Sequence, residues 1–392
     1  MEFHTHLGQT SPYPLGIEIE RAEGIYIYDK QGNAYADLIS GIAVSSLGHG
    51  HPKILRAIHA QVDRHLHTMV YGEFIQDAQM NFAEELLALL PSNLQSVYPV
   101  NSGTEAIEAA MKLTKRATGR HELIAFKGSY HGSTQGSMSI SYNELKKTNY
   151  RPLLPGVTFI GLNDWEDLAN ITVKTAGVFL ETVQGDAGVR IPDVAFLQAL
   201  RERCTATGTL LVFDEIQCGL GRTGRHFAFE HFGVIPDVLV LGKALGGGMP
   251  IGALVTSQEL MSVFKDHPKL GHITTFGGHP VACSAAAAFL QVLKSEINFD
   301  QVEASASIFR SIIGSHPEIL EVRNLGLMFA FDMASAERVE RVVMRCLEKR
   351  ILTFWFLSHP YSFRLAPPLT ITPEEARYYA QEIYQAIEET KA

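Results

Sequence analysis

The chain has 392 residues, of which 46% are apolar and 19% charged, a composition that allows a large core and about two domains. The net charge of −9 comes without a long basic run, which makes nucleic acid a poor partner. No apolar stretch approaches the roughly 20 residues of a membrane span, so no membrane partner is expected.

The first two thirds of the chain predict an α/β fold. Residues 24–40 alternate apolar and polar about Gly32-Asn33, which predicts an antiparallel hairpin. From residue 51, apolar residues at 54, 55, 58, 62 and 66 follow a helical period. Short apolar runs then alternate with helix-like segments: SVYPV, ELIAF, GVFLE, TLLVF and VLVL. Strands that are apolar on both faces predict a mostly parallel sheet covered by helices.

The last third has a different pattern. The Ala-rich residues 281–294 predict a long helix that leaves the sheet, and 326–333, 350–356 and 363–368 predict strands. Helices are expected at about 335–349 and 373–390, the second with Thr372 as its cap and Pro373 in its first turn. We therefore predict a large α/β domain at 51–290 and a small α+β domain built from 1–50 and 291–392.

Two of the apolar runs end in an acid and an amine that could face one pocket. Ligands of open α/β sheets collect at the carboxyl ends of the strands. Lys243 follows VLVL and precedes three glycines, so desolvation would lower its pKa and favour a nucleophilic amine. Asp214, rather than Glu215, is expected to face the pocket and to keep a ring nitrogen protonated. The alternatives are a lysine that reaches solvent and an acid satisfied by backbone N–H groups.

The segment 97–106 runs from a strand through a turn into a helix. Ser102, Gly103 and Thr104 offer hydroxyls and free backbone N–H groups at the helix start, which is suited to a phosphate. The alternative is a capping box, with Ser102 paired to Glu105.

Two further strand ends carry polar or aromatic side chains. Tyr130 and His131 follow ELIAF, where an aromatic ring could stack on a flat cofactor or could be structural. Glu181 ends GVFLE, with Gln184 and Asp186 in the next loop. These groups could order a ring substituent or a substrate cation, and simple loop solvation is the alternative, above all for Gln184.

Three further sequence features are less specific: a glycine-rich motif, two pairs of histidines and the cysteines. Residues 219–224 match G-x-G-x-x-G, but no strand directly precedes them and no clear helix follows, so we interpret them as a Gly-rich active-site loop rather than a nucleotide site. The pairs His49/His51 and His65/His67 have no nearby acidic or Cys partner, so no metal is expected. The four cysteines show no metal-binding spacing and indicate reduced thiols in a cytoplasmic protein.

Seven motifs together resemble those of the class III pyridoxal-phosphate aminotransferases of fold type I, which include the acetylornithine, ornithine and 4-aminobutyrate aminotransferases. They are SGTEA, YHG, VQGDAG, FDEIQCGLGRTG, GKALGGG, TTFGGHP and FRLAPPL, and the resemblance extends from about residue 24 to 372. It implies pyridoxal 5′-phosphate as cofactor and a ping-pong transfer of an amino group, from an ω-amino acid or amine to a 2-oxo acid such as 2-oxoglutarate.

The resemblance also implies roles for individual residues. Lys243 matches the lysine that binds the cofactor covalently, and Asp214 matches the partner of the pyridine nitrogen. Thr275 matches a threonine that reaches the phosphate of the other subunit, which implies a homodimer with shared active sites. Arg364 matches the arginine that pairs with a substrate carboxylate. The remaining matches are Tyr130 with the ring, Gln217 with its hydroxyl group, and Ser102, Gly103 and Thr104 with the phosphate. From their places at strand ends, His131 and Glu181 are also expected to bind the cofactor.

Some positions depart from the family pattern. Ser133 stands where ornithine-type members carry an arginine that assists substrate binding, and Asp186 stands where they carry a glutamate that pairs with the active-site arginine. Thr182 and His279 replace a proline and an asparagine. The alternatives to an aminotransferase are an aminomutase or racemase of the same fold, a nicotinamide-dependent oxidoreductase that uses 219–224, and a non-catalytic cofactor-binding protein.

Overall fold

The computed structural model describes residues 3–391, in which a seven-stranded sheet has the order β4-β10-β9-β8-β7-β5-β6. Strand β10 is antiparallel to β4 and to β9, and the other neighbours are parallel. The mostly parallel α/β sheet is therefore confirmed, although the sequence did not predict β6 and β10. The strands are β4 (Ser96–Val100), β5 (Glu122–Phe126), β6 (Val157–Ile160), β7 (Thr175–Glu181), β8 (Leu210–Asp214), β9 (Val238–Leu241) and β10 (Gly252–Thr256).

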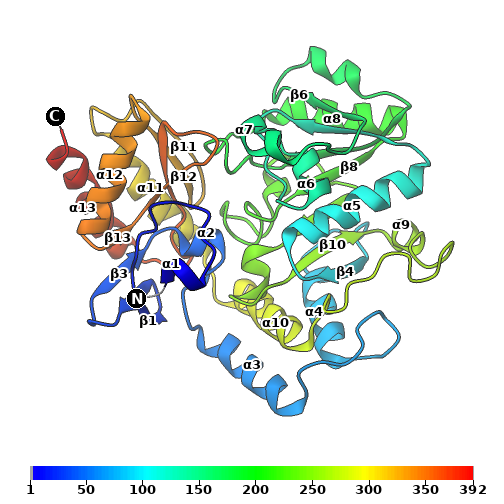
Figure 1. The fold of residues 1–392 in the computed structure, drawn as a ribbon, viewed down its shortest axis with the longest axis horizontal. Helices are drawn as coiled ribbons and strands as arrows, with labels where there is room; N and C mark the ends of the chain where they lie inside the picture. Colours follow the sequence, from blue (N-terminus) through cyan, green and yellow to red (C-terminus); the bar gives the residue numbers. More distant parts are fainter. Residues whose placement is uncertain (1–2, 392) are drawn as a thin grey trace.

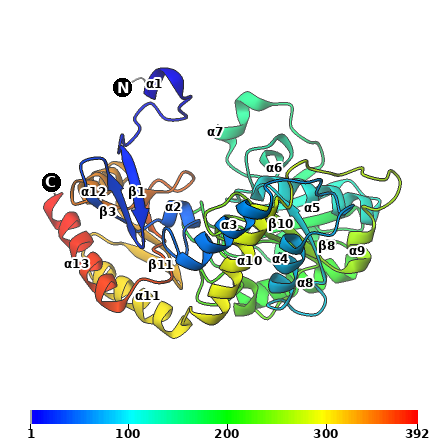
Figure 2. The ribbon, with the colours of Figure 1, turned by 90° about the horizontal axis from the view of Figure 1, so that it is seen from below.

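Both faces of this sheet are covered. In β8, Val212 packs in a cluster with residues of α5 (Gly103–Thr118), whereas Leu211 and Phe213 belong to a cluster that includes residues of α8 (Val194–Thr207). Figure 2 shows these two helices on opposite sides of the sheet. This alternation explains why the strands are apolar at every position, because successive side chains point to opposite faces and both are buried.

The other elements around this sheet are short, apart from the helices α3 (Pro52–Arg64), α4 (Asp77–Leu87) and α10 (Pro280–Ser295). The short ones are α6 (Gln135–Ser139), α7 (Glu144–Lys147), α9 (Gln258–Ser262) and the 3₁₀ helices η1 (Thr148–Tyr150), η2 (Glu166–Asn170), η3 (Ala228–His231) and η4 (Lys243–Gly246). The predicted helices α3 and α10 pack against each other. The apolar side of α3 is only partly covered, since Leu55 and Val62 remain 44% and 45% exposed.

The second group of elements lies on the left of Figure 1, with both chain ends. Its helices are α1 (Phe3–His6), α2 (Ser40–Ala43), α11 (Phe299–Gly314), α12 (Ala336–Glu348) and α13 (Pro373–Glu389). As expected, α13 begins with Pro373 after the cap Thr372. The strands are β1 (Ile19–Glu23), β2 (Tyr26–Asp29), β3 (Ala34–Asp37), β11 (Glu321–Leu325), β12 (Met328–Asp332), β13 (Ile351–Leu352), β14 (Phe354–Trp355) and β15 (Ser362–Leu365).

The two chain ends share one sheet, of order β1-β2-β3-β13, in which β13 runs parallel to β3. The hairpin predicted at 24–40 is confirmed as β2 and β3. The single strand predicted at 350–356 is wrong in part, because β13 pairs with β3 and β14 pairs with β15 in a second sheet, β11-β12-β15-β14. The domain division at residues 50 and 291 remains a prediction. Among residues 3–391, no helix combines the length and the hydropathy of a bilayer-crossing segment.

Candidate active site

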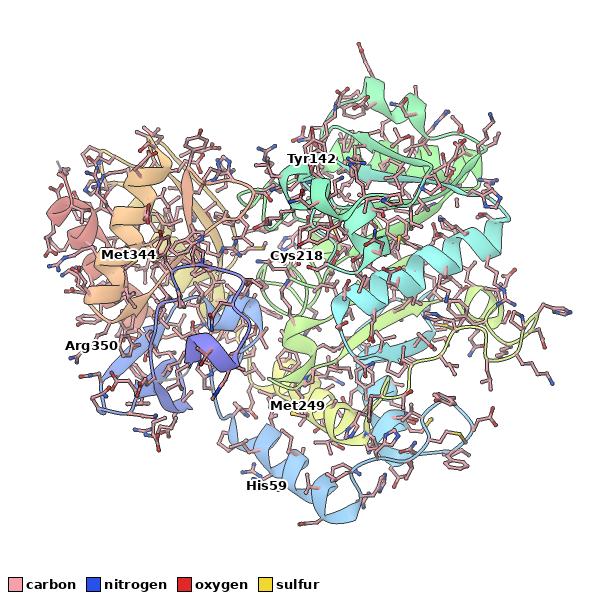
Figure 3. The ribbon with its side chains drawn as sticks, in the orientation of Figure 1. His59, Tyr142, Cys218, Met249, Met344 and Arg350 are labelled. Atoms are coloured by element: carbon pink, nitrogen blue, oxygen red, sulfur yellow. The ribbon has the colours of Figure 1, made fainter. Side chains whose placement is uncertain are left out.

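A cavity of about 270 Å³ lies at the carboxyl edge of the seven-stranded sheet, where β5, β7, β8 and β9 end. Its volume is near the lower end of the roughly 300–1,000 Å³ typical of small-molecule pockets. Figure 3 labels one lining residue, Cys218, near the middle of the molecule, between the two groups of elements. The lining residues are Gly103, Thr104, Tyr130, His131, Gly132, Ser133, Glu181, Val183, Asp214, Ile216, Gln217, Cys218 and Lys243.

Lys243 begins η4, directly beyond β9, and contributes its side chain to the cavity wall. Its φ of +45° lies in the left-handed region, which costs energy for a residue other than glycine and is found most often at functional sites. Burial lowers the pKa of the Lys243 ammonium, although the carboxylates of Asp214 and Glu181 oppose this effect. A neutral amine is therefore easier to reach here than at an ordinary lysine.

Asp214 is the last residue of β8 and is buried at the floor of the site. A hydrogen bond of 2.7 Å joins its Oδ2 to His131 Nδ1, and its Oδ1 accepts from Ile216 N at 3.0 Å. Glu215 points elsewhere, because its carboxylate accepts from the backbone N–H groups of Ala228 and Phe229, both at 2.7 Å. The expectation that Asp214 rather than Glu215 faces the pocket agrees with this geometry.

Glu181, at the end of β7, joins the loop after β5 to the loop after β7. Its carboxylate accepts from Tyr130 N at 2.8 Å and from Gly185 N at 2.9 Å. Burial, with the negative charge of Asp214, raises the pKa of Glu181 to about 7. Glu181 therefore holds the aromatic wall of the cavity, Tyr130, in place through its backbone.

The start of α5 forms another wall of the cavity through Gly103 and Thr104, whereas Ser102 lies outside the lining. Ser102 caps the helix through its Oγ, which accepts from Glu105 N at 3.3 Å. The reciprocal half of a capping box is absent in this described segment, because the Glu105 carboxylate accepts from Asn101 N instead. Thr104 Oγ1 lies 2.7 Å from Ser137 Oγ, so a second hydroxyl supports the helix start.

Arg364 and Asp186 lie outside the cavity lining and form a buried ion pair of 3.2 Å. The alternative of simple loop solvation is wrong for this segment, since Gln184 is fully buried and its side chain donates to Lys127 O at 3.0 Å. Burial lowers the pKa of Arg364, whereas the negative charge of Asp186 raises it. The guanidinium Nε of Arg364 is buried without a partner among residues 3–391. It therefore retains capacity for an incoming carboxylate.

Residues 219–224, which the sequence led us to interpret as an active-site loop, lie outside the cavity lining. Among the described residues, no member of this loop lines the cavity, and Arg222 is fully buried away from it. Arg222 donates to Leu327 O at 3.0 Å, to Pro367 O at 2.5 Å and to Ser46 Oγ at 2.9 Å. The loop therefore fastens the sheet to the second group of elements. Its partners lie more than 100 residues away along the chain, which the local motif could not reveal.

The histidine pairs also differ from expectation. His49 Nε2 lies 2.9 Å from Asp37 Oδ2, and His51 Nε2 lies 3.8 Å from Glu296, so both have acidic partners from other elements. Within 3–391, no group of three or more His, Cys, Asp or Glu side chains is arranged for a metal ion. The four cysteines are buried free thiols.

The sequence missed four lining residues, Gly132, Val183, Ile216 and Cys218. It also missed one cation, Lys146, whose ammonium lies 5.5 Å from the centroid of the Tyr130 ring. Lys146 belongs to the short helix α7, where no strand end marks it. It lies outside the cavity lining, and only the fold brings it close to Tyr130. Thr275 is exposed and lies apart from the cavity of its own chain.

The chain is similar to proteins of known family over nearly its full length. A family model described as aminotransferase class-III matches residues 8–387. The chain belongs to the class III aminotransferases. This aminotransferase is 36% identical to the acetylornithine aminotransferase of Methanopyrus kandleri over 97% of this chain and 96% of that one. It is also 36% identical to the ornithine aminotransferase of Bacillus cereus, over 96% and 95% of the two chains.

The fold of the aminotransferase is also found in solved structures. The ornithine aminotransferase of Toxoplasma gondii superposes with a TM-score of 0.92 at 31% identity, over 99% of this chain and 94% of that one. A second structure of that protein, with a TM-score of 0.89 at 31% identity over 96% and 92% of the chains, has pyridoxal phosphate at partial occupancy in its active site. These matches confirm the expected fold type I architecture and the enzyme class.

Class III aminotransferases depend on pyridoxal 5′-phosphate, and the residues of this site fit the cofactor. The cavity combines a desolvated amine, a buried carboxylate and a helix start, which are the groups suited to its aldehyde, its ring nitrogen and its phosphate. Gly132 makes room at the helix start, because a Cβ there would lie 2.3 Å from Thr104 Oγ1.

Proposed function

We propose that the enzyme transfers the amino group of an ω-amino acid or amine to a 2-oxo acid, with 2-oxoglutarate as acceptor, in a ping-pong cycle. The observation that carries this proposal is the Asp186–Arg364 pair, a buried guanidinium whose charge is balanced by a side chain beside the cavity. Such an arginine can release its aspartate to bind a substrate carboxylate. It can re-form the pair with the aspartate when the bound substrate has no carboxylate next to Arg364. The names of the relatives, acetylornithine and ornithine aminotransferase, support the same class of donor.

The residues of the site have distinct tasks in this cycle. Pyridoxal phosphate, when bound, supplies an electron sink for the charge that develops on the donor carbon. Lys243 would bind the cofactor covalently until the amine of the donor displaces it. The freed Lys243 amine would then take the proton from the donor carbon and return it as a general acid. Asp214, oriented by His131, keeps a proton on the ring nitrogen. Ser102, Gly103 and Thr104 bind the phosphate at the start of α5.

The covalent role of Lys243 is tested by borohydride reduction of the holoenzyme followed by peptide mapping. We expect the cofactor on Lys243, and a label on another lysine would refute the assignment. A panel of amino donors, each with 2-oxoglutarate or pyruvate, tests the reaction. An aminomutase or racemase would turn over without an external 2-oxo acid, so a strict requirement for the acceptor separates these activities.

We further propose a homodimer in which Thr275 reaches the partner's phosphate site. Apolar side chains remain exposed along α3, the segment after it and the segment around Thr275: Leu55, Val62, Leu66, Phe74, Ile75, Ile273 and Phe276. These segments adjoin, since the rings of His67 and Phe276 lie 5.1 Å apart. Contiguous apolar surface of this kind is typical of a protein interface. If Thr275→Val left cofactor affinity unchanged, or sedimentation showed an active monomer, the shared site would be wrong.

A further inference from the structure

A second cation, Lys146, stands beside the aromatic wall of the cavity. Its Nζ lies 5.5 Å from the centroid of the Tyr130 ring, which is 38% exposed and lines the cavity. The neighbouring residue of that wall, Ser133, is uncharged. Its Oγ is hydrogen-bonded to Tyr130 Oη at 3.0 Å. Helix α7, which carries Lys146, lies between the two groups of elements in Figure 1 and above the seven-stranded sheet in Figure 2. Lys146 is therefore the cation on the Tyr130 side of the site.

The charges at this rim do not balance. Lys146 Nζ lies 3.4 Å from Asp186 Oδ2, and Arg364 lies 3.2 Å from Asp186 Oδ1. Among residues 3–391, Asp186 is the carboxylate within 4 Å of either cation. Within this cluster of three side chains, two positive charges thus share one negative charge, whereas the carboxylates of Asp214 and Glu181 line the cavity itself. A substrate carboxylate placed at the cluster would balance its second cation.

Of the two cations, Lys146 is the one that can change partner at lower cost. Asp186 is also held by short bonds, from Leu357 N to Oδ1 at 3.0 Å and from Ser358 Oγ to Oδ2 at 2.6 Å, besides Arg364. The contact to Lys146 is the longest of the four, and the Lys146 side chain is 37% exposed. Its ammonium retains two donors for a new acceptor and already has part of its hydration. Exchange of Asp186 for a substrate carboxylate therefore disturbs little else.

We infer that Lys146 binds the carboxylate of the amino donor and so makes ω-amino acids, rather than uncharged amines, the preferred donors. This inference rests on the proposed function and adds a substrate class to it. In this arrangement the amino group points to Lys243 and the carboxylate of the same molecule lies near Lys146, at the edge of the Tyr130 ring. Arg364 keeps Asp186 during the donor half-reaction and is left for the 2-oxo acid.

The test compares matched donors in the holoenzyme. Single-turnover rates are measured with 4-aminobutyrate against butylamine and with 6-aminohexanoate against hexylamine, for wild type, Lys146→Met and Lys146→Arg. Lys127→Met is the control, since the Lys127 ammonium pairs with one aspartate, Asp167, at 3.6 Å and is 50% exposed, whereas Lys146 contacts Asp186 and the cavity-lining Tyr130. Because the contact is remote from the reacting nitrogen, its loss should raise KM for the amino acid and leave kcat nearly unchanged.

We expect kcat/KM for the amino acid to fall about five- to tenfold in Lys146→Met, as for loss of a partly exposed charged hydrogen bond, while the alkylamine changes little. Lys146→Arg should retain the preference, and Lys127→Met should match wild type. An unchanged ratio in Lys146→Met, or a wild type without preference for the carboxylate, overturns the inference while the proposed transamination stands. A wild type that turns over neither class of donor with any 2-oxo acid overturns both.

Discussion

The ion pair between Asp186 and Arg364 allows a quantitative prediction for Asp186→Asn. The side chain keeps its shape, but Arg364 remains buried without a carboxylate. At the observed 3.2 Å, two unit charges interact by about 5 kcal/mol in an effective dielectric of about 20. Removal of one partner of a buried pair typically costs about 3–5 kcal/mol. Since the asparagine oxygen still accepts hydrogen bonds, we expect a loss near the lower limit, about 3 kcal/mol of unfolding free energy.

The same change should strengthen the binding of carboxylate ligands, because a ligand no longer has to displace Asp186. We expect glutarate, which lacks an oxo group and cannot react, to bind Asp186→Asn about tenfold more tightly, equivalent to about 1.4 kcal/mol. Calorimetric titration and thermal unfolding of the holoenzyme measure the two effects. The control is Glu23→Gln, in which the pair with Arg21 has a similar distance, 3.1 Å, but is exposed to solvent. A variant as stable as wild type, with unchanged glutarate affinity, would refute the reasoning.

Two further predictions follow from buried groups. Because the folded-state pKa of Glu181 is raised to about 7 from 4.5, its stabilising contribution is complete below about pH 4.5 and is lost as the pH rises through 7. Glu181→Gln should therefore gain stability relative to wild type by up to about 3 kcal/mol between pH 5 and 8, and parallel stability–pH curves would contradict this. Arg222→Met should lower the unfolding free energy by about 2–4 kcal/mol, because two carbonyl groups lose a charged donor, with little change in kcat. A loss of kcat at unchanged stability would instead make 219–224 part of the active site.

Local pattern predicted the centre of the site well. Asp214, Glu181 and Lys243 each follow an apolar run, and parallel strands bring their carboxyl ends to one edge. This rule needs no knowledge of distant contacts, so the sequence was enough to place these residues at one edge of the sheet. Their catalytic roles remain predictions.

Distant contacts explain what the sequence could not show. The donors to Asp186 come from residues 357 and 358 and from Lys146, and the acid bonded to His49 is Asp37, on another strand. The split of 350–356 between two sheets has the same origin. Residues 351–352 pair with β3, whereas residues 354–355 pair with β15. Periodicity records which face of an element is buried, whereas it carries no information on the neighbour that buries it.

The parallel pairing of β13 with β3 has a consequence for biosynthesis. Residues 351–352 leave the ribosome after more than 300 further residues have followed residue 37. At roughly 5–20 residues per second, the N-terminal hairpin waits between about 15 seconds and a minute for its neighbour. During that interval one edge of β3 is open to other nascent chains, so this edge is where chaperone protection would be needed during translation.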